Sequence, residues 1–308
     1  MRLEIRYRSM FEYESFVTES QNELRACPVS DEYQELIGYR VVVSPAAKIA
    51  SFVDYWGTRV DAFGHREPHS FLEVVASAAV ETRPRPLPSG ISRSGLLVDP
   101  PFVDRHAEFL ERTPHCDWGA EIAALAAQHV ALAGDDVVSK VLALQRLVGA
   151  RLQDRKGVTT IGLPVDDVLT GGVGVCQDYA HLAIALCRSV GIPARYVSGY
   201  LFTRDETTLV DPVPEDDESL RVLTHAWFEA AIPAWGWLAL DPTNQTIVGE
   251  RHVKIGHGRD YDDARPLCGV YSGAAEGRVT PTVEMRRRTG ASAVTDPARR
   301  MQQAAQQQ

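Results

Sequence analysis

The sequence predicts an α+β protein in which a β-rich N-terminal region precedes a core of helices and antiparallel strands. Three observations support this prediction. Several short runs in the first 80 residues alternate apolar with polar residues, which is the period of a half-buried strand. The middle of the chain has helical periodicity, and strand-like runs return from residue 194 to residue 240. A proline-rich stretch separates the first region from the helices.

The N-terminal region is expected to consist of strands. Leu3, Ile5 and Tyr7 alternate with charged residues at the start of the chain, as in a strand with one buried face. Further strands are predicted over residues 41–44, 51–56, 58–65 and 70–80. The stretch Thr82–Pro88 has proline at alternate positions, which favours extended backbone and predicts a linker.

Helices and then strands are expected to follow. Apolar residues recur with helical spacing over residues 120–132 and 136–151, so both segments are predicted to be helices. A third helix is expected to begin at Cys176 and to end at Gly191–Pro193, where glycine and proline stop helices. Strands are then predicted at residues 194–202, 222–232 and 236–240.

These elements divide the chain into regions. The predicted regions are an N-terminal β-rich domain (1–85), a linker (86–115), a core (116–273), a possible C-terminal strand (274–289) and a disordered tail (290–308). The tail is predicted to be disordered because its end is rich in glutamine and poor in apolar residues.

Composition excludes several functions. The net charge of −9 and the pI near 5.5 argue against nucleic-acid binding, because no basic field would attract phosphates. The sequence contains no run of about 18 apolar residues, so no membrane-spanning helix is predicted. Its charged start lacks the apolar core of a secretory signal. The five cysteines are scattered without C-x-x-C spacing, so free thiols in a cytoplasmic protein are expected.

One cysteine stands where a nucleophile would be expected. Cys176 follows the glycine-rich run Gly171–Gly174 and begins a predicted helix. The N-terminus of a helix offers partial positive charge and unpaired N–H groups, which favour a thiolate and could hold an oxyanion. His225 lies on a predicted strand, and Asp241 directly follows the next one. This order predicts a thiol nucleophile, an imidazole base and a carboxylate that orients the imidazole.

Several motifs resemble the bacterial transglutaminase-like superfamily. The resemblance is carried by Gly174–His181, Ala185–Arg188, Gly191–Tyr200, His225–Trp227 and Asp241–Asn244, and in members with an N-terminal β-domain also by Tyr55–Gly57, Arg66–His69 and Gly258–Asp263. It covers roughly residues 1–273. It implies a papain-like, transglutaminase-like α+β core, in which the nucleophile stands at a helix N-terminus packed on an antiparallel sheet. In that fold Cys176 is the nucleophile, His225 the base and Asp241 the orienting carboxylate.

Other residues near these motifs have simpler interpretations. Cys187 is expected to pack in the core, and His181 is expected to pack or to support the site rather than to act as a second base. Zinc bound by Cys176, His181 and Cys187 is an alternative with an unusual ligand spacing. Asp178 is expected to stabilise the start of the helix. The acidic stretch 204–221 is a loop that either is simply solvated or selects cationic substrates. Arg259–Asp263 lacks the register of an EF-hand, so no calcium site of that type is predicted.

These observations lead to two alternative hypotheses for the function. The first is a thiol enzyme without a cofactor that cleaves an amide or isopeptide bond in a peptide or protein through an acyl-thioester, with water favoured over an amine as acceptor. The superfamily also contains crosslinking enzymes, peptidases, amidases and inactive members. The second hypothesis is therefore an inactive peptide-binding or scaffold protein that keeps the fold. The oligomeric state is left open, as is the role of the N-terminal domain.

Overall fold

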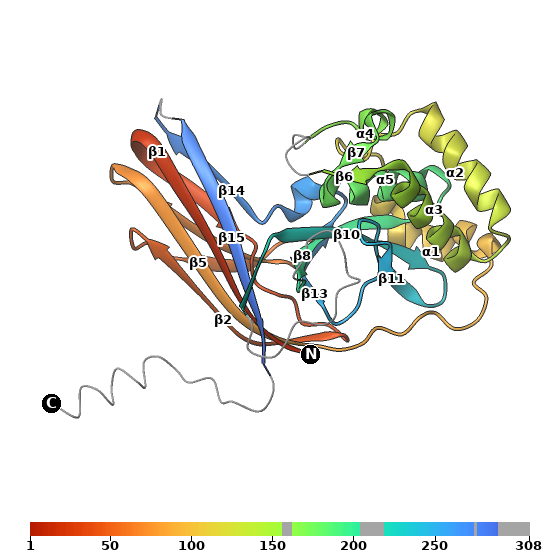
Figure 1. Cartoon of the computed structure of the whole chain (residues 1–308), viewed down its shortest axis with the longest axis horizontal. Coiled ribbons are helices and arrows are strands. Elements are labelled where there is room, and N and C mark those ends of the chain that lie inside the picture. The colour runs from red at the N-terminus through yellow and green to blue at the C-terminus, as the bar shows by residue number, and fades with distance from the viewer. Residues whose placement is uncertain (156–161, 204–218, 274–275, 289–308) are drawn as a thin grey trace.

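The computed structural model describes residues 1–155, 162–203, 219–273 and 276–288 (Figure 1). Its helices are η1 (Ser94–Val98), α1 (Pro100–His106), η2 (Ala107–Phe109), α2 (Ala120–Leu132), α3 (Val137–Arg151), α4 (Val165–Gly171), α5 (Cys176–Ser189) and η3 (Tyr261–Ala264), where η marks a 3-10 helix. Its strands are β1 (Arg2–Leu24), β2 (Gln34–Ser44), β3 (Ala50–Val53), β4 (Arg59–His65), β5 (His69–Thr82), β6 (Gln153–Asp154), β7 (Val173–Gly174), β8 (Ala194–Leu201), β9 (Ser219–Val222), β10 (Thr224–Ile232), β11 (Gly236–Asp241), β12 (Thr246–Ile247), β13 (His252–Gly258), β14 (Leu267–Ser272) and β15 (Gly277–Arg287). The predicted tail at 290–308 lies outside the described residues.

The N-terminal region forms an antiparallel sheet, in agreement with its alternating sequence. Its strands lie in the order β2-β5-β1-β15-β9. Leu3, Ile5 and Tyr7 are buried on one face of β1, whereas the residues between them are exposed. The first half of β1 pairs with β5 and β15, and its second half pairs with β4 and β14. The long strand β1 therefore belongs to both parts of the N-terminal sheet.

Segments from the second half of the chain complete this sheet. β15, within the predicted C-terminal strand range, pairs with β1 from Leu3 to Tyr13. β9 then pairs with β15 as the last strand on that side. Residue 223 separates β9 from β10, so the chain passes directly from the N-terminal sheet into the core sheet.

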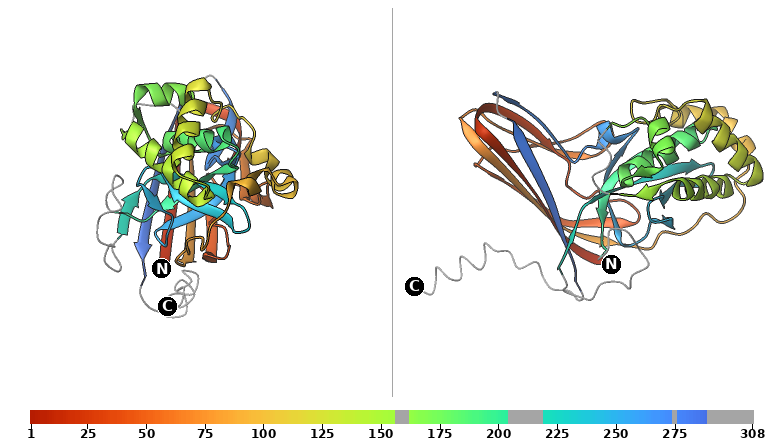
Figure 2. Two further views of the ribbon diagram at one scale, coloured as in Figure 1. Left: turned by 90° about the vertical axis from the view of Figure 1, so that its right-hand side faces the viewer. Right: turned by 45° about the horizontal axis from the view of Figure 1, so that its top comes forward.

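The core is built from five antiparallel strands and the helices beside them. Its strands lie in the order β12-β11-β10-β8-β13. Figure 2 shows the helices gathered on the side of these strands that faces away from the N-terminal sheet. Eleven residues of α5 are buried, because α2, α3 and α4 pack around this helix and the strands β8 and β10 cover its remaining side. The helix that begins at Cys176 is thus held firmly in the protein.

The two regions share a hydrophobic core. Tyr200 of β8 and Val253 of β13 belong to the same buried cluster as Leu3 of the N-terminal sheet. Phe202 also belongs to this cluster and has no exposed surface. The core strands therefore use one face to pack against α5 and another to pack against the N-terminal sheet, so the two regions support each other.

The segment predicted to be a linker contains short helices. Leu97 of η1 and Phe102 of α1 pack against the core cluster. Pro100 and Pro101 occupy the first turn of α1, where proline is tolerated because those N–H groups have no intrahelical partner. Part of the predicted linker thus covers the core rather than merely connecting the two regions.

A buried ion cluster lies on the core sheet. Glu229 of β10 accepts hydrogen bonds from Lys254 Nζ at 2.8 and 2.9 Å and from Arg195 Nε at 2.7 Å, and only 1 % of its surface is exposed. Burial alone would raise the pKa of Glu229, but the two cations lower it well below its usual range. Burial lowers the pKa of Lys254 to about 8.

Glu229→Gln is expected to lower the free energy of unfolding by about 3–5 kcal/mol, because it leaves two buried cations without their carboxylate. The measurement is urea unfolding at pH 7. A matched control is Glu35→Gln, because the pair between Glu35 and Arg83 is exposed and exposed pairs contribute little. An equal loss in both variants would contradict the importance of the buried cluster.

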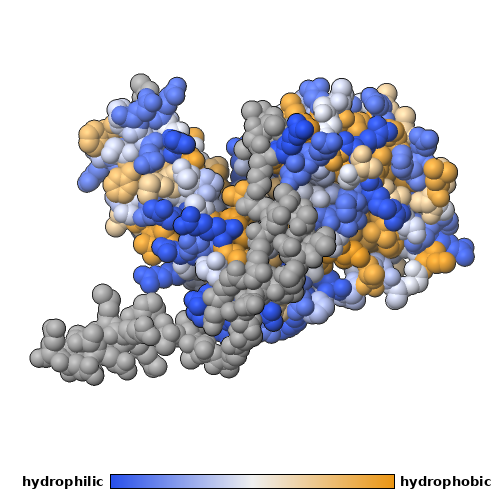
Figure 3. Space-filling model, in the orientation of Figure 1, coloured by the Kyte–Doolittle hydropathy of each residue, from blue (hydrophilic) through white to orange (hydrophobic). Residues whose placement is uncertain are grey.

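The described part of the chain contains no helix long and apolar enough to cross a membrane. Figure 3 shows hydrophilic and hydrophobic residues mixed over the described part of one face of the molecule, on both the N-terminal sheet and the core.

Candidate active site

The start of α5 fixes the position of the Cys176 thiol. α4 ends at Gly171 and is capped by Gly172, whose positive φ of 65° suits glycine. β7 leads from there to Val175 and Cys176. Asp178 Oδ2 accepts a hydrogen bond from the backbone N–H of Val175 at 2.9 Å. A Cβ at Gly174 would lie only 2.8 Å from Asp178 Cβ, so this close turn requires glycine. As predicted, Asp178 stabilises the start of the helix.

The structure brings His225 and Asp241 together at neighbouring strands. His225 lies near the start of β10, opposite Gly199 of β8, and Asp241 is the last residue of β11. His225 Nε2 lies 2.8 Å from Asp241 Oδ2, and both side chains are buried. Gln145 of α3 holds the end of β11 by donating to the Asp241 carbonyl at 3.0 Å.

The imidazole of His225 also reaches Cys176. Both side chains line the same pocket, and interaction with the Cys176 thiol is one of the causes that raise the pKa of His225. Because Nε2 already contacts Asp241, Nδ1 is the ring nitrogen that remains for the thiol. Burial lowers the pKa of His225, but Asp241 and Cys176 together outweigh burial and raise this pKa to about 10. The structure therefore brings the three residues predicted from sequence together, with His225 between the Cys176 thiol and the Asp241 carboxylate.

Asp241 accepts more hydrogen bonds than the sequence indicates. Oδ2 accepts from His225, from His252 Nε2 at 3.0 Å and from Asn244 Nδ2 at 2.7 Å. Oδ1 accepts from the backbone N–H groups of Thr243 and Asn244, each at 3.1 Å. Burial raises the pKa of Asp241, but His225 and His252 together outweigh this and hold it well below its usual range. The carboxylate is therefore ionised and fixed in orientation.

A pocket opens at the meeting point of Cys176 and His225. It is lined by Asp154, Val175, Cys176, Leu201, Thr203, Val222, Leu223, Thr224, His225 and Thr243. The Thr243 hydroxyl is buried and has no hydrogen-bond partner within the described structure. Because the first N–H groups of a helix lack intrahelical partners, the backbone at Cys176 can hold an oxyanion beside the sulfur. The arrangement can therefore carry out acyl transfer to a thiol.

Two groups of described residues have the composition of a metal site. One consists of His225, Asp241 and His252, and the other of His115, Asp260 and Asp262. In the first, the ligand atoms are already hydrogen-bonded to one another. In the second group, Asp262 Oδ1 accepts hydrogen bonds from His115 Nε2 and from Arg265 Nε, each at 3.0 Å. Internal hydrogen bonds thus account for both groups.

The alternative zinc set does not form within the described structure. Cys187 is completely buried in the hydrophobic core. His181 Nε2 accepts a hydrogen bond from the backbone of Tyr261 at 3.2 Å, and its ring stacks on His115. The packing of Cys187 and the contacts of His181 therefore account for both residues without a metal ion.

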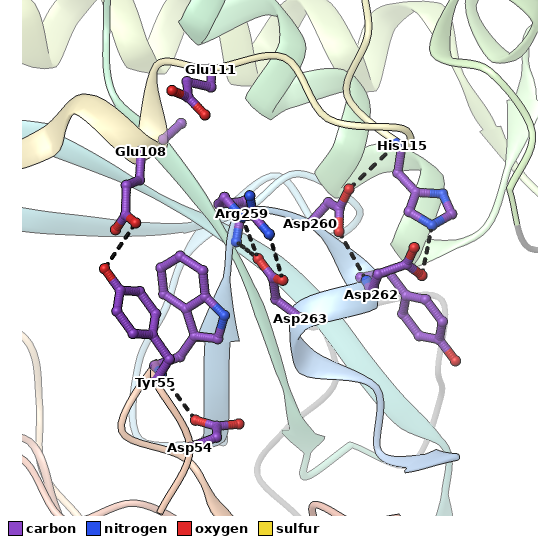
Figure 4. Close-up of polar contacts among 12 residues, drawn as sticks. Asp54, Tyr55, Glu108, Glu111, His115, Arg259, Asp260, Asp262 and Asp263 are labelled. Carbon is purple, nitrogen blue, oxygen red and sulfur yellow. Dashed lines mark hydrogen bonds and ion pairs between the residues drawn. The ribbon is translucent and has the colours of Figure 1, made fainter. Parts of the chain in front are cut away.

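The motif Gly258–Asp263 connects distant parts of the chain (Figure 4). Arg259 binds Asp263 through two nitrogens, at 2.9 and 3.1 Å, and its guanidinium lies over the ring of Trp56. The neighbouring Tyr55 donates its hydroxyl to Glu108 at 2.9 Å. This motif therefore helps to fasten a loop of the N-terminal region to the core, and none of its residues lines the pocket.

His252 and the amide of Asn244 also contact Asp241, and sequence patterns do not predict either contact. His252 lies 11 residues beyond Asp241 at the start of β13, and no local pattern distinguishes it from a packed histidine. Asn244 is the last residue of the motif Asp241–Asn244, but the motif alone does not indicate what its side chain contacts. In the predicted acidic loop, residues 204–218 lie outside the described residues, whereas 219–222 form β9.

Comparisons with known proteins agree with this fold. The profile of the transglutaminase-like superfamily matches residues 123–242, and that of the bacterial transglutaminase-like N-terminal region matches residues 3–81. An uncharacterized protein of Mycobacterium leprae is 35% identical over 291 residues, which cover 93% of this chain and 99% of that protein. An uncharacterized protein of Mycobacterium tuberculosis is 32% identical over 87% of both chains. A crystal structure from Cytophaga hutchinsonii, described as a candidate cysteine protease, superposes with a TM-score of 0.74 and 24% identity, over 95% of this chain and 92% of the other.

Proposed function

Because the chain belongs to the transglutaminase-like superfamily, we propose that it is a thiol enzyme that cleaves an amide or isopeptide bond. The observation that carries this proposal is a pocket lined by both Cys176 and His225, in which His225 Nε2 lies 2.8 Å from the ionised Asp241 carboxylate. A buried histidine alone could be structural. A histidine that contacts both a thiol and an ionised carboxylate has the arrangement of a thiol-activating base.

In the proposed reaction, the Cys176 thiolate attacks the carbonyl carbon of the scissile amide. A carbon–sulfur bond forms, and the carbonyl oxygen becomes an oxyanion near the backbone N–H groups at the start of α5. The His225 imidazolium donates its proton to the leaving nitrogen as the carbon–nitrogen bond breaks. Water then attacks the acyl-thioester, His225 accepts a proton from this water, and the acid leaves with restoration of the thiolate–imidazolium pair.

The substrate class that we propose is a peptide or protein. Leu201, Val222 and Leu223 give the pocket an apolar wall, which suits the aliphatic part of a side chain. The hydroxyl of Thr243 can form a hydrogen bond with a polar group there. Water is the proposed acceptor, and an amine is the competing acceptor that the assay distinguishes. The cytoplasmic location stays a prediction from sequence.

The test is to incubate the protein with a library of peptides and isopeptides in H₂¹⁸O, with and without a primary amine. Mass spectrometry then identifies the products. Hydrolysis gives a new carboxylic acid that carries one ¹⁸O atom, whereas transfer gives an amine adduct without it. We expect the labelled acid as the main product, and the same product from Cys268→Ala, since Cys268 is not among the residues that line the pocket. A library left unchanged would contradict the proposed function.

A further inference from the structure

His252 makes two hydrogen bonds that define which ring nitrogen carries its proton. The backbone N–H of Gly249 donates to His252 Nδ1 at 3.3 Å, so Nδ1 is an acceptor. The other nitrogen, Nε2, lies 3.0 Å from Asp241 Oδ2, and a carboxylate can only accept. His252 Nε2 must therefore carry the hydrogen. The ring is thus a neutral donor to the carboxylate that also holds His225.

The surroundings of His252 favour this neutral form. Its side chain is only 2 % exposed, and burial is the largest influence that lowers its pKa. Asp241 acts to raise this pKa, whereas the positive charges of His225 and Arg85 act to lower it. At neutral pH the balance leaves one charged histidine, His225, and one neutral histidine, His252, on the same carboxylate oxygen.

The segment that carries His252 is held from both regions of the protein. The backbone N–H of His252 donates to the Gly249 carbonyl at 3.0 Å. Thr82, at the end of β5 in the N-terminal sheet, donates its hydroxyl to the Glu250 carbonyl at 2.6 Å. Phe202 donates its N–H to the Arg251 carbonyl at 2.9 Å. The rings of Trp227 and His252 pack nearly perpendicular to each other, with their centres 5.4 Å apart. His252 therefore has little freedom to turn.

We propose that His252 is a positioning residue that holds Asp241 so that His225 keeps its hydrogen on Nε2 and directs Nδ1 toward Cys176. This proposal rests on the proposed function, because it assigns His252 a role in the same site. It also gives the N-terminal sheet a part in the reaction, since Thr82 supports the segment from which His252 extends. Without the His252 donor, the carboxylate loses one of the three hydrogen bonds to Oδ2 and is held less firmly against His225.

The test uses His252→Leu, which removes the donor, and His252→Gln, whose side-chain amide can still donate to Asp241. The rate at which iodoacetamide alkylates Cys176 at pH 6 is measured relative to Cys268 in the same protein by peptide mass spectrometry. Alkylation needs no substrate, so this readout remains valid even if the proposed function is wrong. We expect His252→Leu to lower the Cys176 rate about tenfold, the scale of losing an outer partner of a functional side chain, and His252→Gln to restore much of it.

The matched control is His69→Leu. His69 is also a buried histidine with both ring nitrogens in contact, with Ser20 Oγ and the Glu67 carbonyl, but it lies in the N-terminal sheet. We expect it to leave the Cys176 rate unchanged. A folded His252→Leu protein with the wild-type rate would overturn the proposal.

Should His252→Leu fail to fold, the wild-type protein still provides a test. The ¹⁵N chemical shifts of the histidine rings at pH 7 report which nitrogen carries each hydrogen. We expect a neutral His252 with its hydrogen on Nε2. A charged His252, or one with its hydrogen on Nδ1, would contradict the proposed role.

Discussion

Cys176→Ala is expected to lower kcat/KM by at least about 10⁴-fold, because no other group in the pocket can form the acyl-thioester. Cys176 is half-buried at the pocket wall, whereas Cys27, Cys116 and Cys187 are buried. Burial raises the pKa of those three thiols to about 11, 12 and 12, so they are poor nucleophiles near neutral pH. Iodoacetamide labelling at the peptide that carries residue 176 is expected to disappear as well.

The measurement is steady-state kinetics with the best substrate from the peptide library. Cys268→Ala serves as the control, because Cys268 is the other half-buried cysteine and lies on β14. Its activity is expected to equal that of the unmodified protein. Full activity of Cys176→Ala would end the proposal of a thiol enzyme.

Asp241→Asn is expected to lower kcat by about 10³–10⁴-fold, with a small effect on KM. Asp241 Oδ2 accepts three hydrogen bonds, and Oδ1 accepts two from backbone N–H groups. An amide has only one acceptor oxygen, so its NH2 group must face donors on one of these two sides, and the negative charge is lost in either orientation. His225 would then lose the partner that fixes its tautomer and stabilises its charge. The thiol would remain, but its base would be neutral and misdirected.

The pH dependence of stability provides a second measure of this substitution. In the folded protein the pKa of His225 is raised to about 10, so the pair with Asp241 stabilises the fold fully below the unfolded value near 6.5 and loses this contribution as the pH rises through about 10. The lowered pKa of Asp241 gives a contribution that is complete above about pH 4 and is lost as the pH falls. Urea unfolding between pH 3 and pH 10 measures both effects. We expect Asp241→Asn to reduce both slopes, with the part of the acid slope that comes from Glu229, whose pKa is also lowered, remaining. Unchanged slopes would contradict the buried ion pair.

The positions of the three proposed catalytic residues could be predicted because each has a local signal. The glycine-rich run before Cys176 predicts a tight turn into a helix, and α5 begins at that residue. His225 and Asp241 occupy a strand and a strand end, and a short connection between β10 and β11 brings neighbouring strands into register. Local sequence therefore limited where each side chain could lie, and the short hairpin limited their separation.

Other features depend on contacts between residues far apart in the chain, which periodicity does not reveal. β14 and β15 pair with β1 across more than 240 residues, so nothing near either segment identifies its partner. β1 continues to Leu24, but its second half changes pairing partners and its buried residues no longer alternate strictly. His252 is a similar case, because its contact with Asp241 arises from the order of the strands in the sheet rather than from a motif.

The central claim is that Cys176, activated by His225 and Asp241, becomes acylated during the reaction. Acid quenching of the protein during turnover, followed by peptide mapping and mass spectrometry, tests it most directly. We predict that the acyl group of the substrate is found on the Cys176 sulfur as a thioester that hydroxylamine removes. Two results would contradict this claim. One is turnover that leaves the acyl group on another residue, and the other is turnover without any acylated protein under conditions that trap a thioester.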